Sequence, residues 1–316
     1  LGADFAELFV ERSQTNMVST LSSHVQSVQS GIDFGVGVRL VYGTKVLYGY
    51  TNKAEEAELK RIVSELAAKD RRDPRISFTN FDYRRVEDKH AANRILSTDP
   101  EVDGKVAFLL ATDKAARAAS NMISQTRGTC GQVEQKIELF NSEGLHTGDI
   151  RNYTRAFLVA IASDGSEQST GSWNDGGLMG WELVERMNSE AAGKEAARQA
   201  LVNLSAKPCP SGRMPVVLGN GFGGVIFHEA CGHLLETTSV AKKASVFHDK
   251  MGEMIANPVV NAVDDGTMIK ERGSINIDDE GLDSQRTQLI KDGKLTSFLV
   301  DRIGSQQTGF ARTGSG

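Results

Sequence analysis

The sequence predicts an α+β fold, in which antiparallel strands and helices occupy separate stretches of the chain. Apolar and polar residues alternate through the first fifty residues, where the turn at 42–45 joins two strands as a hairpin. A second strand-turn-strand pattern runs from 130 to 163, with its turn at 141–144. Because the strands occur in hairpins rather than alternating singly with helices, a parallel α/β sheet is disfavoured.

Apolar spacing predicts the remaining elements of the first two hundred residues. Residues 54–70 carry leucine, isoleucine and valine on one helical face, and residues 180–205 read as one long amphipathic helix. The apolar run at 106–111 predicts a strand, followed by a helix from 112 to about 124. The stretch 69–102 is polar, contains two prolines and suggests no element.

The segment 206–213, with two prolines and a glycine, breaks the long helix and predicts a domain boundary. We therefore divide the chain into an N-terminal domain at 1–205, a linker at 206–213 and a second domain at 214–316. Within the second domain the patterns predict a strand at 214–218, a helix at about 222–236, a strand at 259–263 and a hairpin around 291–294.

Composition excludes several classes of protein. Hydrophobic content of 39% is ordinary for a globular domain, and the net charge of −5 without a basic stripe argues against direct nucleic-acid binding. The longest apolar runs, at 106–111 and 157–162, are too short to cross a membrane. Three unevenly spaced cysteines and an acidic start without a signal-peptide pattern indicate a cytoplasmic protein.

The chemistry is concentrated in one segment, where His228 and Glu229 are followed by His233. Zinc held by neutral imidazoles can acidify water and polarise a carbonyl, and an adjacent glutamate can take the proton. The familiar zinc-peptidase helix spaces its histidines i and i+4, whereas the spacing here is i and i+5. That spacing separates them by about 140° on an ideal helix. We therefore expect a π-bulge at Gly232, or His233 just beyond the regular turn.

Alternatives remain open at each of these positions. His228 and His233 could be an ordinary pair on an amphipathic helix. Cys231 could be a ligand, although a small buried thiol is the simpler interpretation. Glu236 could contact the ligand His233 without touching the metal, or it could simply face solvent. His248 lies in a polar stretch and is expected in an exposed loop.

The glycines at 219–224 have the spacing of a dinucleotide-binding loop. That fingerprint requires a following parallel strand that ends in an acidic residue, and the corresponding stretch here is loop-like and ends in lysines. We interpret these glycines as a tight turn that lets another backbone approach the site.

The last hundred residues closely resemble the TldD/PmbA family. The resemblance lies in the runs PVVLGNGFGGVIFHEACGHLLE, VVNAVDDGT, RGSINIDDEG, QRTQLIKDGKLTSFLVDR and TGFARTGSG, and GADFAELFVE and ASDGSEQSTGSW match more loosely in the right order. The intact His228-Glu229 and His233 motif is similar to that of TldD-type subunits, since the PmbA-type relatives lack it.

This resemblance implies an α+β N-terminal domain, a β-rich catalytic C-terminal domain, and a homodimer or a heterodimer with a PmbA-type partner. It also implies unfolded or extended peptides as substrates, His228 and His233 as metal ligands, and Glu229 as the catalytic residue. The family's further metal ligand is a cysteine nearer the C-terminus, which none of the three cysteines here matches. The chain begins without methionine and stops at Gly316, so we expect it to be cut at both ends.

The sequence therefore predicts a zinc-dependent peptidase. A rival hypothesis is a non-catalytic interaction subunit that modulates DNA gyrase through protein contacts, which a substituted Glu229 would favour. A dinucleotide-dependent oxidoreductase is the weaker third hypothesis.

Overall fold

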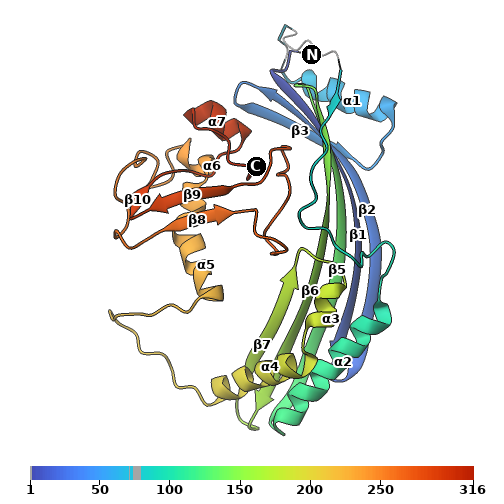
Figure 1. The fold of residues 1–316 in the computed structure, drawn as a ribbon, viewed down its shortest axis with the longest axis vertical. Helices are drawn as coiled ribbons and strands as arrows, with labels where there is room; N and C mark the ends of the chain where they lie inside the picture. The colour runs from blue at the N-terminus through green and yellow to red at the C-terminus, as the bar shows by residue number, and fades with distance from the viewer. Residues whose placement is uncertain (1, 71, 74–79) are drawn as a thin grey trace.

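The computed structural model describes residues 2–70, 72–73 and 80–316. Its main element is a sheet of seven strands in the order β3-β2-β1-β5-β6-β4, with β7 also pairing with β6. Figure 1 shows this sheet as a long curved band, with the C-terminal residues on the inner side of its curve. The strands are β1 Phe5–Leu21, β2 His24–Tyr42, β3 Lys45–Thr51, β4 Asp82–Tyr83, β5 Ile123–Asn141, β6 Leu145–Ser163 and β7 Gln168–Gly177.

The α+β prediction and the two hairpin turns are confirmed. All strand pairs in the large sheet are antiparallel except the short pair between β4 and β6. The turn at 43–44 joins β2 to β3, and the turn at 142–144 joins β5 to β6. Side chains of β5 alternate between buried and less buried positions along most of its length, as expected for a strand with two different faces.

Three helices pack on one face of this sheet. They are α1 Glu56–Ala67, α2 Val102–Ala119 and α4 Ser189–Leu204, and a short helix, α3 Glu182–Arg186, precedes α4. A buried cluster unites the β5–β6 strands with α2 and the alanine-rich face of α4. At Gly193 the helices approach so closely that a Cβ atom would lie 2.3 Å from the Thr112 carbonyl oxygen.

Two predictions for the first two hundred residues are wrong, the strand at 106–111 and the single helix at 180–205. Residues 106–111 are not a strand but the middle of α2, which contacts α4 on one side and β1 and β5 on another. Burial on two sides produces a continuous apolar run that periodicity cannot distinguish from a strand. The single helix expected at 180–205 is two helices, because Met187 is extended and the Asn188 side chain caps α4 by accepting a hydrogen bond from the Ala191 N–H.

The unassigned stretch 69–102 contains β4 and otherwise lacks strands and helices up to α2 within its described residues. Residues 71 and 74–79 of that stretch lie outside the described residues.

A buried lysine lies beneath α2. The Lys105 side chain is fully buried, and its Nζ donates hydrogen bonds of 2.6 Å to the Asn16 Oδ1 and of 2.6 Å to the Pro100 carbonyl. The ammonium lies 5.9 Å from the centre of the Trp181 ring. Burial lowers the pKa of Lys105 to about 8, since removal from water disfavours its charged form.

We expect this lysine to make stability rise with pH. Between about 8 and the unfolded lysine value of about 10.4, the unfolded chain binds more protons than the folded one, so the free energy of unfolding increases with pH. Lys105→Met should remove an increase on the order of 3 kcal/mol. Urea unfolding at the two ends of this window measures it, with Lys60→Met, an exposed lysine of α1, as the control. An unchanged pH slope in Lys105→Met would contradict the assignment.

The chain after α4 runs through residues 205–220 without regular structure and with exposed side chains. The strand expected at 214–218 is therefore wrong. Beyond it lie the short helices α5 Gly224–Phe227 and α6 Thr237–Val240, a small sheet of β8 Ala262–Asp265, β9 Arg286–Lys291 and β10 Lys294–Leu295, and α7 Arg302–Thr308. The expected hairpin around 291–294 is confirmed, and the strand expected at 259–263 begins at Ala262.

The C-terminal residues pack on the face of the large sheet opposite its helices. Ile277 is fully buried against Ile137 and Leu139 of β5. Around this contact, the Arg302 guanidinium donates two hydrogen bonds to the Glu143 carboxylate, at 2.7 and 2.8 Å. The same guanidinium lies 3.8 Å from the centre of the Phe5 ring. These contacts fix the segment that carries the histidines relative to the sheet.

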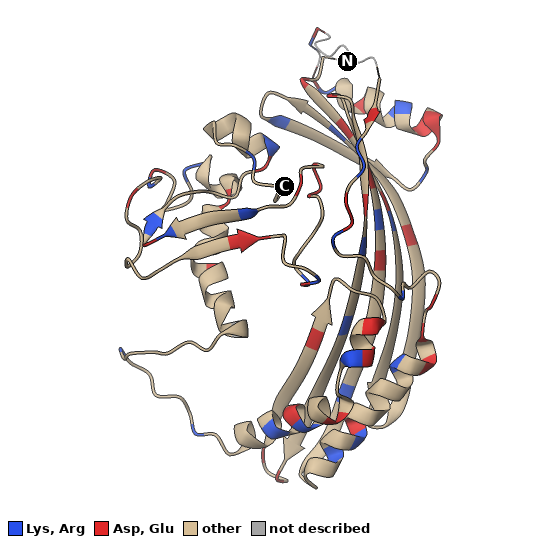
Figure 2. Ribbon diagram, viewed as in Figure 1, with Lys and Arg blue, Asp and Glu red and all other residues tan. Residues whose placement is uncertain are grey.

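Charge is distributed as the sequence suggested. Figure 2 shows basic and acidic residues interspersed over the sheet and helices, without a basic stripe. Within the described part of the chain, no helix is long and apolar enough to cross a lipid bilayer.

Candidate metal centre

The segment that carries the histidines changes its helical type at the motif. α5 leads into a π-helix at His228–Gly232 and then into a 3₁₀ turn at His233–Leu235. The His233 N–H donates to the His228 carbonyl, an i+5 to i hydrogen bond. The expected departure from α geometry is therefore confirmed, since one π turn places residue i+5 above residue i.

This turn brings three potential ligands together. The imidazole centres of His228 and His233 lie 4.4 Å apart, and the planes of the two rings meet at 65°. One carboxylate oxygen of Glu229 lies 3.9 Å from the His233 Nε2. One nitrogen or oxygen atom from each of the three residues lies within 4.8 Å of the others. The two histidines thus lie on one side of the helix, not on opposite sides of a regular one.

The His233 ring is held by a neighbouring carboxylate. The His233 Nδ1 lies 2.8 Å from the Glu236 Oε1, and the Thr238 hydroxyl donates to the other Glu236 oxygen at 3.3 Å. Glu236, and to a lesser extent Glu229, raises the pKa of His233. A carboxylate on one ring nitrogen fixes the orientation of the imidazole and leaves the other nitrogen, here Nε2, for a metal. Of the two interpretations of Glu236, the structure favours support of His233.

The end of the motif is anchored to a distant part of the chain. The Leu299 N–H donates to the Leu235 carbonyl at 2.8 Å, and the Thr237 N–H donates to the Leu299 carbonyl at 2.9 Å. Leu235 is fully buried in the C-terminal core, next to Phe298. This anchor was not predictable from the sequence, because Leu235 and Leu299 are far apart in the chain and no spacing pattern links them.

Cys231 belongs to the core rather than to the metal group. Its side chain is partly buried and packs against the cluster that contains Leu235. Burial raises the pKa of the thiol, which disfavours the thiolate that a metal would require. His248 is half-buried in a turn, where its Nδ1 lies 3.0 Å from the Ser245 carbonyl oxygen, so the exposed loop expected for it is not observed.

The donor set fits zinc. Two imidazoles and a carboxylate within one turn are the ligand types that zinc prefers, and all three side chains are exposed, so a substrate can reach them. Catalytic zinc sites ordinarily use three protein ligands and keep one position for water. If Glu229 acts as a base, the described residues provide two of the three.

The glycines before the motif leave room for another backbone. A Cβ atom at Gly219, Gly221 or Gly224 would meet nothing within 4 Å, and Gly221 adopts a φ of +74°. Residues 205–220, directly before this loop, contain no strand, and α5 has only four residues. The strand-loop-helix arrangement of a dinucleotide site is therefore absent here. The interpretation as an open turn is therefore favoured.

Gly232 offers a direct test of the π turn. A Cβ atom there would lie 3.5 Å from the His228 Nδ1, an ordinary contact. We expect Gly232→Ala to keep zinc binding, whereas Gly232→Val should weaken it roughly tenfold, because its branched methyl groups press on the imidazole and resist the turn. Competition with a chromophoric chelator measures both affinities. Equal zinc affinity in the alanine and valine variants would contradict this role.

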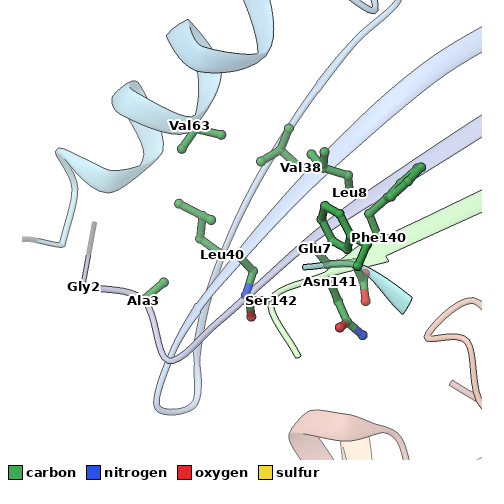
Figure 3. A pocket seen from close by; sticks show the side chains of 12 residues that line it. Gly2, Ala3, Glu7, Leu8, Val38, Leu40, Val63, Phe140, Asn141 and Ser142 are labelled. Carbon is green, nitrogen blue, oxygen red and sulfur yellow. The ribbon is translucent and has the colours of Figure 1, made fainter. Parts of the chain in front are cut away.

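A separate hollow lies under α1, away from the motif. It has a volume of about 320 Å³ and a mainly apolar lining. Figure 3 shows Val63 of α1 facing Val38 and Leu40 of β2, with Leu8 and Phe140 beside them. Among the described residues that line it there is no group of metal ligands, so the metal chemistry does not involve this hollow.

Comparison with known proteins then gives the family. Residues 6–69 match domain 1 of the PmbA/TldA metallopeptidases, residues 95–204 match the central domain, and residues 211–316 match the C-terminal domain. The chain belongs to the PmbA/TldD metallopeptidase family. The resemblance inferred from the sequence is therefore confirmed.

Individual relatives agree with this assignment. The chain is 33% identical to a metalloprotease TldD homolog of Haemophilus influenzae, and the match covers 99% of this chain and 66% of that protein. It is 26% identical to a metalloprotease of Methanocaldococcus jannaschii, over 99% of this chain and 69% of that protein. The chain thus spans about two thirds of the length of these relatives.

Solved structures share the fold. TldE from Thermococcus kodakarensis has a TM-score of 0.75 at 16% identity, covering 99% of this chain and 70% of that one. A Thermotoga maritima protein whose name associates it with DNA gyrase has a TM-score of 0.78 at 20% identity, with 99% of this chain and 70% of that one covered. At these identities the likeness concerns the fold alone.

Proposed function

We propose that this chain carries the metal-binding and proton-transfer groups of a zinc-dependent peptidase that cleaves unfolded or extended peptides. The observation that supports the proposal most is the π turn, which brings His228 and His233 to one side of the helix with Glu229 beside them. An interaction subunit that acts on DNA gyrase would not require these three side chains to converge, so the geometry favours a peptidase.

Each residue has a distinct role in this proposal. His228 and His233 hold zinc through ring nitrogens, and Glu236 keeps the His233 imidazole in position. Bound zinc supplies a Lewis acid that acidifies water and polarises the scissile carbonyl. Glu229 takes a proton from the attacking water and passes it to the leaving amine.

In this proposal the substrate backbone lies beside the open glycine turn at 219–224. Exposed apolar side chains flank it on both sides, namely Val216, Val217 and Leu218 before it and Val225, Ile226 and Phe227 after it. A peptide with apolar side chains could pack on these residues, and its backbone could approach the glycines closely. Association with a second copy or with a PmbA-type subunit remains part of this proposal.

Metal removal tests the proposal. In the full-length protein we expect a chelator to abolish peptide hydrolysis and zinc to restore it, whereas magnesium should not, since imidazole ligands suit zinc and magnesium prefers oxygen. Residues 1–316 alone should retain less zinc on desalting, because two imidazoles are one ligand short of an ordinary catalytic site. Elemental analysis and a quenched fluorescent peptide provide the two measurements.

His233→Ala is the matched loss-of-ligand variant, and it should lose both zinc and hydrolysis. Hydrolysis that survives complete metal removal would disprove the metal-dependent mechanism. Stoichiometric zinc in residues 1–316 would instead mean that the third ligand is already present, with Glu229 or Glu236 as the candidates.

A further inference from the structure

One edge of the large sheet is open along much of its length. β3 pairs with β2 only between Val36 and Tyr42, so residues 24–35 of β2 have β1 on one side and, within the described residues, no strand on the other. Natural proteins usually protect such an edge with charges, proline or a short strand. This edge has one charged side chain, Asp33, and no proline, and it exposes Val28 and Ile32.

A hollow lies where β3 ends and this open edge begins. Its volume is about 640 Å³, and its lining includes Glu11, Asp33, Gly35, Tyr48 and Tyr50. The strand register places Glu11 opposite Gly35, and both Phe9 and Tyr50 opposite Gly37. Residues directly opposite each other on neighbouring strands share a face of the sheet, and so do residues two positions apart on one strand. The side chains of Glu11, Asp33, Tyr48 and Tyr50 therefore lie on one face, around glycines that have no side chains. A Cβ atom at Gly37 would lie 2.6 Å from the Tyr48 hydroxyl, so a side chain there would displace the Tyr48 ring.

The lining favours a positively charged side chain. Tyr48 and Tyr50 are 61% and 78% exposed, and their ring centres lie 6.5 Å apart. Glu11 accepts a hydrogen bond from the Ser13 hydroxyl, and Asp33 accepts one from the Phe34 N–H. In the described part of the chain neither carboxylate has an ion-pair partner, and no lysine or arginine lines the hollow. Exposed aromatic faces and free carboxylates attract lysine and arginine and repel anions.

We propose that an extended peptide with a lysine or arginine pairs along residues 24–35 of β2 and places that side chain in the hollow. The peptide continues the line of β3, so its backbone satisfies the open N–H and C=O groups of β2. Its cationic group lies near Glu11 and Asp33, over Gly35, with Tyr50 beside it. The occupant class follows from the proposed function, whereas binding at this edge requires neither the metal nor Glu229.

Fluorescence anisotropy tests this site in the metal-free protein with a Glu229→Gln background, so that cleavage does not interfere. The probe is a short labelled peptide of alternating valine and threonine with one central lysine, and a matched probe has glutamate at that position. We expect saturable binding of the lysine probe, about tenfold tighter than the glutamate probe. Two further lysine probes carry methyl groups on alternate backbone nitrogens, one on the odd and one on the even positions. The probe whose methyl groups face β2 should not bind.

Variants then locate the site. Two variants should each remove the preference for lysine, namely E11Q/D33N and, separately, Tyr50→Ser. Circular dichroism should show unchanged folding, since Tyr50 is an exposed side chain. The matched control is E56Q/E167Q, which removes the same charge at two exposed positions outside the hollow.

Four results would overturn the proposal, three of them in the peptide-binding experiments. The first is equal affinity of wild-type protein for both probes, and the second is an equal loss of preference in the control variant. The third is binding that His233→Ala abolishes, which would assign the peptide to the metal centre. If hydrolysis survives complete metal removal, or zinc does not restore it, but the lysine probe still binds here, the proposed function is wrong and this site stands. Self-association through this edge, with no peptide bound, would assign it to a second copy of the chain and likewise overturn the proposal.

Discussion

Glu229→Gln is expected to lower peptide hydrolysis by the full-length protein at least about a hundredfold while zinc binding stays nearly unchanged. Glutamine has nearly the same shape as glutamate, but its amide cannot take a proton from water at neutral pH. The Glu229 side chain is 66% exposed and its Oε2 lies 3.9 Å from the His233 Nε2, so it can approach water next to the ligands. Single-turnover hydrolysis and elemental analysis of the same preparation separate chemistry from metal binding.

Two matched variants make this result interpretable. Glu236→Gln alters the carboxylate that holds His233, so it should reduce zinc affinity by about 10- to 100-fold and affect hydrolysis through metal occupancy. Glu253→Gln changes an exposed acid of the same C-terminal region and should alter neither quantity. Hydrolysis by Glu229→Gln at the wild-type rate would disprove the base assignment, whereas loss of zinc from Glu229→Gln would identify Glu229 as a ligand.

The sequence predicted the local features that rest on strong local rules. The i and i+5 histidine spacing indicated a helical irregularity, and the π turn at His228–Gly232 provides it. Hairpin turns at 43–44 and 142–144 were equally clear, because glycine and neighbouring polar residues mark them. The break between α3 and α4 also had a signal, the helix-capping Asn188, which the amphipathic pattern of residues 180–205 obscured.

What the sequence did not predict depends on contacts between distant residues. Residues 214–218 have a strand-like composition, but a strand needs a partner, and these side chains are exposed without one among the described residues. The apolar run of α2 was misassigned because burial between α4 and the sheet removes helical periodicity. Likewise, no spacing in the sequence connects Glu280 with Arg39, although the structure places them 2.9 Å apart.

That last contact belongs to a buried ionic cluster between the C-terminal region and the sheet. The Glu280 side chain is 4% exposed. Its Oε1 accepts from the Arg39 guanidinium of β2 at 2.9 Å, and its Oε2 accepts from the Arg302 N–H at 2.9 Å and lies 3.1 Å from the Arg312 guanidinium. Arg39 also donates to Glu7 of β1 at 3.1 Å. Burial is the main reason that the pKa of Glu7 is raised. One carboxylate therefore joins two strands of the sheet to the residues around α7.

Glu280→Ala is expected to lower the free energy of unfolding by about 3 to 5 kcal/mol. The loss is large because Arg312 keeps its charge but loses the only ion-pair partner it has among the described residues, while Arg39 keeps Glu7 alone. Urea unfolding measures the change. Glu253→Ala, a glutamate whose side chain is 56% exposed and whose partner is Lys250, should cost less than about 1 kcal/mol.

The same variant also tests how the metal centre is positioned. The motif joins the large sheet covalently only through the exposed segment at 205–220, so its place against the sheet depends on contacts such as those of Glu280. If Glu280→Ala loosens this packing, limited proteolysis should cut within 205–220 or 270–284 sooner than in Glu253→Ala. Zinc affinity should change little, because the π turn and Glu236 are local to the motif. Equal stability and equal proteolysis of the two variants would show that the apolar contact of Ile277 with β5 holds the two parts together without the ionic cluster.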